Sequence, residues 1–183
     1  MLKFLKLLIK RDTTSSGNEE VIGRPIEVYL QQELDVCSYI KSECHKTALD
    51  HLTHVTNLNK TGNKLTAEEK KFLGINARLA ITHELVSILT SDGVKQKDPK
   101  EILSRIYYRA TFAKNRDDSL NEYKSAGIKK YTLMNCGDGR DCQWCSLQQG
   151  VEISVNENIN ELINNNCTCD SHCRCVMQPV IQF

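Results

Sequence analysis

The cysteines of this chain are concentrated near its C-terminal end. Nine cysteines occur among 183 residues, and all except Cys37 and Cys44 lie between positions 136 and 175. An odd number of cysteines, spread so unevenly, does not suit a disulfide framework that staples a whole domain. We therefore expect the clustered cysteines to gather around one site and to determine how the last third of the chain folds.

The N-terminal segment bears on where the chain is made. Residues 1–11 carry four positive charges and no acid, and lysines interrupt the apolar residues every three or four positions. No apolar run there has the length of a signal-peptide core or the roughly 18 residues of a membrane span. We expect residues 1–24 to form a basic amphipathic segment and a linker. We also expect that the chain has no membrane span and that it is made in a reducing cytoplasm. In a reducing compartment, clustered cysteines favour metal binding over disulfides.

Length and composition exclude several classes of protein. The chain is 40% apolar and 26% charged with a formal net charge of +1. These values disfavour a disordered chain, a collagen and a strongly basic polyanion binder. The length suits one domain, or one small domain with an appended module.

Residues 25–127 are expected to form a helical region. Apolar residues recur at steps of three and four from Pro25 to Leu58, again over 66–93, and again over 98–126. Thr66 with Glu69 forms a capping-box pattern, and Gly127 suits the end of the third helix. We therefore predict an antiparallel bundle of three long helices.

The pattern changes after Gly127. Residues 128–134, 151–154 and 176–183 have the alternation of short strands, and Pro179 would restrict the last one to a sheet edge. Residues 156–166 suit either a short helix or a loop. The expected fold class is α+β, mainly α, with a long-helix N-terminal bundle and a small zinc-stapled α+β module at residues 128–183.

The cysteines themselves fall into two groups. Cys142 and Cys145 form a Cys-x-x-Cys pair, and residues 167–175 supply four more cysteines and His172. Two ligands from each group would close a tetrahedral structural zinc site. A redox Cys-x-x-Cys would require a βαβ context that the helical pattern does not offer. Disulfides formed after assembly of an extracellular particle remain an alternative.

No catalytic constellation is found in the sequence. A His-Glu-x-x-His motif is missing, and so is the zinc-deaminase pattern. We expect a non-enzymatic protein in which the metal has a structural role.

From about Arg109 onward, several motifs follow one another in a fixed order. They are a Tyr-Lys-x-Ala-Gly lead into a strand (residues 123–130), an Asp-x-Arg-x-Cys-x-x-Cys motif (138–145), a Leu and a Gly (147 and 150), a Cys-Arg-Cys (173–175) and a Pro-Val tail (179–180). In this order they resemble the motifs of the phage Mu F-like family of head morphogenesis (minor head) proteins.

The resemblance implies a structural role in the phage particle. The expected partners are the portal, the major capsid protein or both, with packaged DNA as a further contact. The expected locations are the capsid of the virion and, during assembly, the host cytoplasm. The family's histidine ligand falls on Asp170. The implied zinc ligands are therefore Cys142, Cys145, Cys173 and either Cys169 or His172, with Cys167 and Cys175 as further candidates.

An alternative is a zinc-knuckle nucleic-acid-binding regulatory protein. Residues 128–183 carry four Lys or Arg against six Asp or Glu. An acidic balance disfavours contact with phosphates, so this alternative ranks second.

Overall fold

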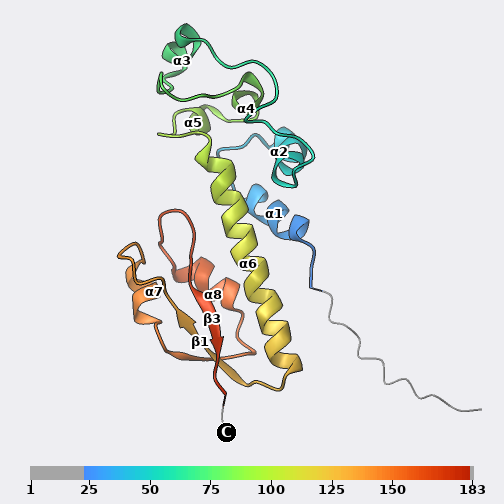
Figure 1. Ribbon diagram of the computed structural model, residues 1–183, viewed down its shortest axis with the longest axis vertical. Helices are drawn as coiled ribbons and strands as arrows, with labels where there is room; N and C mark the ends of the chain where they lie inside the picture. The colour runs from blue at the N-terminus through green and yellow to red at the C-terminus, as the bar shows by residue number, and fades with distance from the viewer. Residues whose placement is uncertain (1–22, 182–183) are drawn as a thin grey trace, which may run out of the picture.

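The computed structural model describes residues 23–181, and the expected basic segment over residues 1–24 falls almost wholly outside that range (Figure 1). The described chain is a mixture of helices and a small sheet, in line with the α+β expectation. The helices before the sheet are α1 (Ile26–Asp35), the 3-10 helix η1 (Ser42–Cys44), α2 (His45–Leu52), α3 (Ala67–Leu73), α4 (His83–Ser87), α5 (Ser91–Val94) and α6 (Glu101–Ser125). No helix among residues 23–181 is long and apolar enough to cross a bilayer.

The predicted helix over residues 25–58 is wrong. It breaks after α1, because the segment after Asp35 turns and pairs with a distant part of the chain. Lys41 N–H donates to the Ile88 carbonyl (2.9 Å) and Thr90 N–H donates to the Tyr39 carbonyl (3.0 Å). β-branched and aromatic residues between α1 and η1 are weak helix formers, so this pairing overrides the helical spacing of the apolar residues.

The predicted helix over residues 66–93 is also wrong. Its start is correct, since Thr66 and Glu69 form the capping box at α3. However, Gly74 adopts φ +69°, a left-handed conformation that ends α3. The side chains of Thr82 and Thr90 then cap α4 and α5 separately. Three short helices replace one long helix, so the predicted bundle of three long helices is not formed.

The third predicted helix is confirmed as α6, which spans 25 residues. Gly127 follows it at φ +74°, and Ile128 N–H returns to the Tyr123 carbonyl (2.9 Å), which closes the last turn. Figure 1 shows α6 running from the short helices at the top to the sheet at the bottom.

The C-terminal part contains three strands, β1 (Lys130–Met134), β2 (Glu152–Ser154) and β3 (Val176–Pro179), which form an antiparallel sheet in the order β2-β1-β3. Pro179 lies in the edge strand β3, as its missing N–H predicts. Tyr131 and Leu133 of the central strand are fully buried. The region 156–166, left open between helix and loop, contains a helix. The helices of this part are α7 (Gln143–Leu147) and α8 (Ile159–Asn166).

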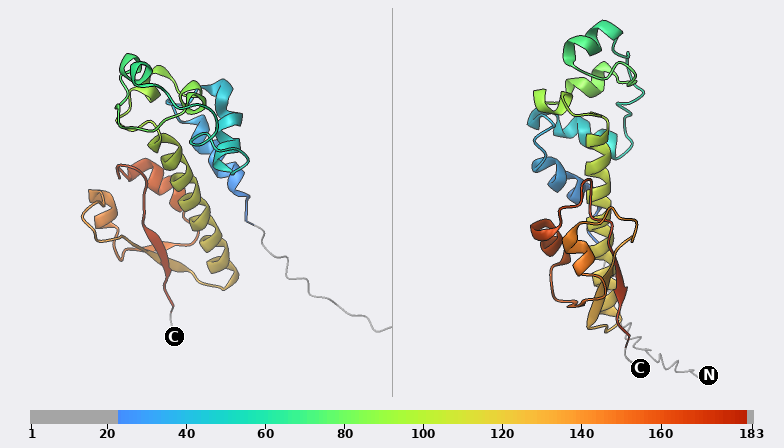
Figure 2. Two further views of the ribbon diagram at one scale, coloured as in Figure 1. Left: turned by 45° about the horizontal axis from the view of Figure 1, so that its top comes forward. Right: turned by 90° about the vertical axis from the view of Figure 1, so that its left-hand side faces the viewer.

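Two hydrophobic clusters divide the described residues, and both draw on α6. The first cluster contains Ile102, Leu103, Ile106 and Ala110 of α6 together with residues from α1 to α4. The second contains Leu120 of α6, the sheet, α8 and buried cysteines. Figure 2 shows this division from two other sides, with the short helices at one end of α6 and the sheet at the other.

Candidate metal centre

Three segments of the C-terminal part bring six cysteines together. Cys142 and Cys145 come from the start and the first turn of α7, after a turn in which Gly137 and Gly139 adopt φ +63° and +74°. Cys167 directly follows α8. The other three stand between Cys167 and β3, and they are Cys169, Cys173 and Cys175.

Four of these cysteines form one compact group. The sulfur atoms of Cys142, Cys145, Cys167 and Cys169 all lie within 4.8 Å of one another. Cys145 Sγ is 3.6 Å from Cys167 Sγ and 3.8 Å from Cys169 Sγ, and Cys142 Sγ is 3.9 Å from Cys167 Sγ. Four sulfurs at zinc–sulfur distances of about 2.3 Å in a tetrahedron would be about 3.8 Å apart. The group therefore has the dimensions of a tetrahedral thiolate site.

Backbone amides point at the sulfurs of this group. Thr168 N–H donates to Cys142 Sγ (3.4 Å), Cys142 N–H to Cys169 Sγ (3.4 Å) and Cys169 N–H to Cys167 Sγ (3.5 Å). Such bonds stabilise negative charge on sulfur and fix the direction of each thiolate.

A second group shares a member with the first. The sulfur atoms of Cys145, Cys173 and Cys175 lie within 4.8 Å of one another, and Cys145 Sγ is 3.7 Å from Cys173 Sγ. All three side chains are buried, with exposed fractions of 0%, 7% and 1%. The structure has no disulfide at any of the nine cysteines, all of which lie within the described residues.

The surroundings shift the thiol pKa values in opposite directions. Burial raises the pKa of Cys142, but backbone amides of Cys145 and Thr168 outweigh it and lower the value to about 6. The hydrogen bond from Cys175 lowers the pKa of Cys173 to about 5. Burial raises the pKa of Cys145 and raises that of Cys167 to about 12. Without a metal, the cluster therefore holds both thiols and thiolates.

Arg116 of α6 places a buried positive charge beside the sulfurs. Its side chain is 7% exposed, and its Nε donates to Asn160 Oδ1 of α8 (2.7 Å). Burial lowers the pKa of Arg116, whereas the nearby charges of Cys173 and Cys175 raise it. No local pattern in the sequence predicts this contact, because Arg116 and the cysteines are far apart along the chain.

Asp138 and Arg174 tie the two cysteine-bearing loops together. Arg174 donates to both carboxylate oxygens of Asp138, at 2.6 and 2.8 Å. Its other close acid is Asp141, at 3.6 Å. Hydrogen bonds from Arg174 and Arg140 hold the pKa of Asp138 well below its usual range. This bidentate ion pair holds the loop before α7 against the loop before β3.

The structure gathers four of the five ligands predicted from the sequence. Cys142, Cys145 and Cys169 lie in the first group and Cys173 lies in the second. His172 lies outside both groups, because its ring stacks on Tyr108 of α6 with ring centroids 5.0 Å apart.

Two cysteines that the sequence left as further candidates, Cys167 and Cys175, also belong to the groups. Cys136 does not, since its exposed sulfur lies 3.8 Å from the Arg174 carbonyl. Spacing alone could not rank these residues, since all of them fall within one cysteine-rich stretch.

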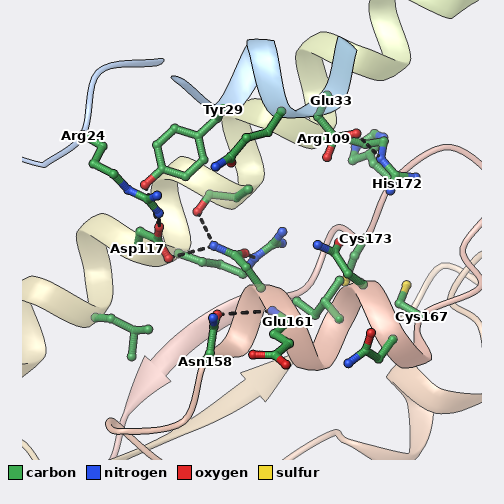
Figure 3. Close-up of a pocket in the computed structure, with 18 of the residues that line it drawn as sticks. Arg24, Tyr29, Glu33, Arg109, Asp117, Asn158, Glu161, Cys167, His172 and Cys173 are labelled. Atoms are coloured by element: carbon green, nitrogen blue, oxygen red, sulfur yellow. Dashed lines mark hydrogen bonds and ion pairs between the residues drawn. The ribbon is translucent and has the colours of Figure 1, made fainter. Parts of the chain in front are cut away.

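A polar groove of about 940 Å³ adjoins the centre between α1, α6 and α8. In Figure 3, Arg24 and Tyr29 point at Asp117 at one end of the groove, and Cys167 and Cys173 lie at the other. Tyr29 OH donates to Asp117 Oδ2 (2.6 Å), and Asn160 Nδ2 donates to Asp117 Oδ1 (2.7 Å). Asp117 thereby links α1 to α8 through α6.

Comparison with known proteins adds no relative. No family model, no curated protein and no solved structure matches this chain. The assignment of a function therefore depends on the site itself and on the sequence motifs.

Proposed function

We propose that this chain is a structural minor head protein of a bacteriophage, with a C-terminal module held together by zinc. The observation that carries the proposal is the convergence of the motif residues. Asp138, Cys142 and Cys145 belong to one end of the phage-like motif and residues 173–175 to the other. Asp138 nevertheless binds Arg174, and Cys145 lies beside Cys173. These two parts of the motif, which are far apart in the sequence, therefore contact each other in one site.

The donor set suits zinc. Six soft thiolate ligands exclude magnesium and calcium and leave zinc, copper(I) or iron–sulfur chemistry. The first group has the spacing of a tetrahedral site, so its ligands are Cys142, Cys145, Cys167 and Cys169. With all four positions filled by protein, the ion would have no place for water and would act as a staple. This set replaces the one implied by the resemblance.

The fold is suited to a role in assembly. α6 connects a helical region, which offers surface for a partner, to a module whose geometry a bound ion would fix. The partners in this proposal are the portal and the major capsid protein, with packaged DNA as a further contact, and the locations are the host cytoplasm during assembly and then the virion.

The role in the phage head is tested by co-assembly. The full chain is produced together with the portal and major capsid proteins of a phage that carries it, and capsids are isolated by sedimentation. We expect the chain to co-sediment in a few copies per particle. A chain that stays soluble while capsids form would contradict the proposal.

The metal is tested separately by elemental analysis of protein purified without oxygen. Zinc in the wild type, zinc retained in Cys37→Ser and zinc lost in Cys142→Ser are the expected results. Iron in place of zinc, or no metal with paired thiols, would contradict the zinc staple. Salt-dependent DNA binding by the chain without capsid association would favour the regulatory alternative instead.

A further inference from the structure

The two cysteine groups overlap at a single sulfur. Cys145 Sγ lies 3.6 and 3.8 Å from Cys167 and Cys169, and it also lies 3.7 Å from Cys173. A single tetrahedral ion bound by the first group would leave Cys173 and Cys175 as an unused pair beside it. The second group therefore needs its own explanation.

Burial argues against treating that pair as ordinary packing residues. Cys175 is 1% exposed and Cys173 is 7% exposed, and they lie with Cys145 within 4.8 Å. The second cluster devotes three of its ten buried residues to sulfur atoms that converge on one point. One disulfide does not account for this group, because a disulfide joins two sulfurs and three converge here.

The number of ligands fits two ions. Two tetrahedral ions have eight ligand positions, and six thiolates fill them when two sulfurs are each shared by both ions. Cys145 belongs to both groups and is one shared ligand. The second group then needs one more ligand, which a second shared sulfur of the first group supplies when six thiolates fill eight positions.

A buried arginine offsets part of the charge of such a cluster. Two divalent ions and six thiolates leave a negative cluster, which is costly to bury alone. Arg116 is buried, and the thiolates of Cys173, Cys175 and Cys167 favour its charge. Its Nη1 has no hydrogen-bond partner among the described residues. Its guanidinium therefore serves as the counter-charge.

We propose that the chain binds two zinc ions in one thiolate cluster, with Cys145 as a ligand to both. The ligands are Cys142, Cys145, Cys167, Cys169, Cys173 and Cys175. This inference rests on the zinc staple proposed above. Each thiol releases its proton when the ion binds, so all six are thiolates in the loaded protein.

The test is a metal titration of the full chain. Apo-protein prepared under reducing, oxygen-free conditions is titrated with zinc against a chromophoric chelator. We expect two equivalents for the wild type and for Cys44→Ser, whose cysteine lies outside both groups. Cys175→Ser is expected to bind one equivalent, because the first group remains complete.

A second measurement needs no substitution. The wild-type chain is loaded with cadmium-113 and examined by NMR, and we expect two resonances coupled to each other through a shared sulfur. One bound ion, lost in Cys142→Ser but kept in Cys175→Ser, would overturn the two-ion cluster and leave the single zinc staple standing. No bound ion would overturn both.

Discussion

Arg116 is a buried charged residue that lies against the cysteine cluster. We expect Arg116→Met to weaken zinc binding about 10- to 100-fold, the usual effect of losing a group that supports metal ligands. The physical reason is that the thiolates would lose their buried counter-charge. Competition with a chelator of known affinity measures the change.

The matched control for Arg116 is on the same helix. Arg105 is exposed on α6, so Arg105→Met removes the same charge away from the cysteines. Its zinc affinity should equal that of the wild type. Equal affinities in both variants would show that Arg116 has no electrostatic role at the centre.

Asp138 gives a prediction with a defined pH dependence. Its pKa is lowered in the folded protein, so its contribution to stability is full above the ordinary aspartate pKa of about 4 and is lost as the pH falls below it. We expect Asp138→Asn to be less stable than the wild type at pH 7. The difference should shrink below about pH 4. Urea unfolding at several pH values measures it.

The control for this prediction is Asp170→Asn. Asp170 is an exposed acid in the same cysteine-rich stretch. A loss of stability as large as that of Asp138→Asn would mean that net charge, and not the contact with Arg174, is responsible.

Among the secondary-structure elements, α4 depends on one buried hydroxyl. Thr82 is 1% exposed, donates to the Leu58 carbonyl and accepts from Leu85 N–H (3.2 Å). We expect Thr82→Val to lower the free energy of unfolding by about 1–2 kcal/mol, because two buried backbone groups lose their partner. Thr82→Ser keeps the hydroxyl and should retain most of the stability. Urea unfolding compares these variants with the exposed control Thr56→Val.

The elements also show how far the sequence could be interpreted. α6, the three strands and the capping box at Thr66 follow from local signals, namely periodicity, alternation and cap residues. The break after α1 does not, because it depends on hydrogen bonds from Lys41 to Ile88 across the fold. Gly74 and Thr82 are residue types that end and begin helices, but the apolar residues continue at helical spacing across both positions and favour one unbroken helix.

The same distinction between local and long-range signals holds at the candidate metal centre. Local spacing identifies Cys142 and Cys145 as a ligand pair, since both lie on one short turn. The choice among the later cysteines depends on how the loop before β3 lies on α7, which spacing does not determine. His172 shows this most clearly, because its ring packs on α6 rather than facing the sulfurs.

At the scale of the whole molecule, the two hydrophobic clusters differ in what stabilises them. The first contains seventeen buried residues, whereas the second contains ten, three of them cysteines. A core of that size rarely stabilises a module without a staple. The second cluster should therefore depend on bound metal and the first should not.

We therefore expect removal of zinc by a chelator to unfold the C-terminal part selectively. Backbone amides of β1, β2, β3 and α8 should lose protection from hydrogen exchange, whereas those of α1 and the first half of α6 should keep it. The second half of α6 is the informative segment, because Leu120 packs in the second cluster while the helix continues into the first. Its protection should fall gradually toward Gly127. Mass spectrometry of peptides from the full chain, with and without chelator, resolves these segments.

The hydrogen bonds of Asp117 determine how far the loss of hydrogen-exchange protection extends beyond the C-terminal part. Asn160 of α8 donates to this carboxylate, and so do Tyr29 of α1 and Arg24, so loss of α8 removes one of three partners and leaves two. α1 should then lose little protection, because Tyr29, Leu30 and Leu34 stay buried in the first cluster. Uniform loss over both clusters would mean that the chain unfolds as one unit, and unchanged protection everywhere would mean that the metal does not stabilise the module.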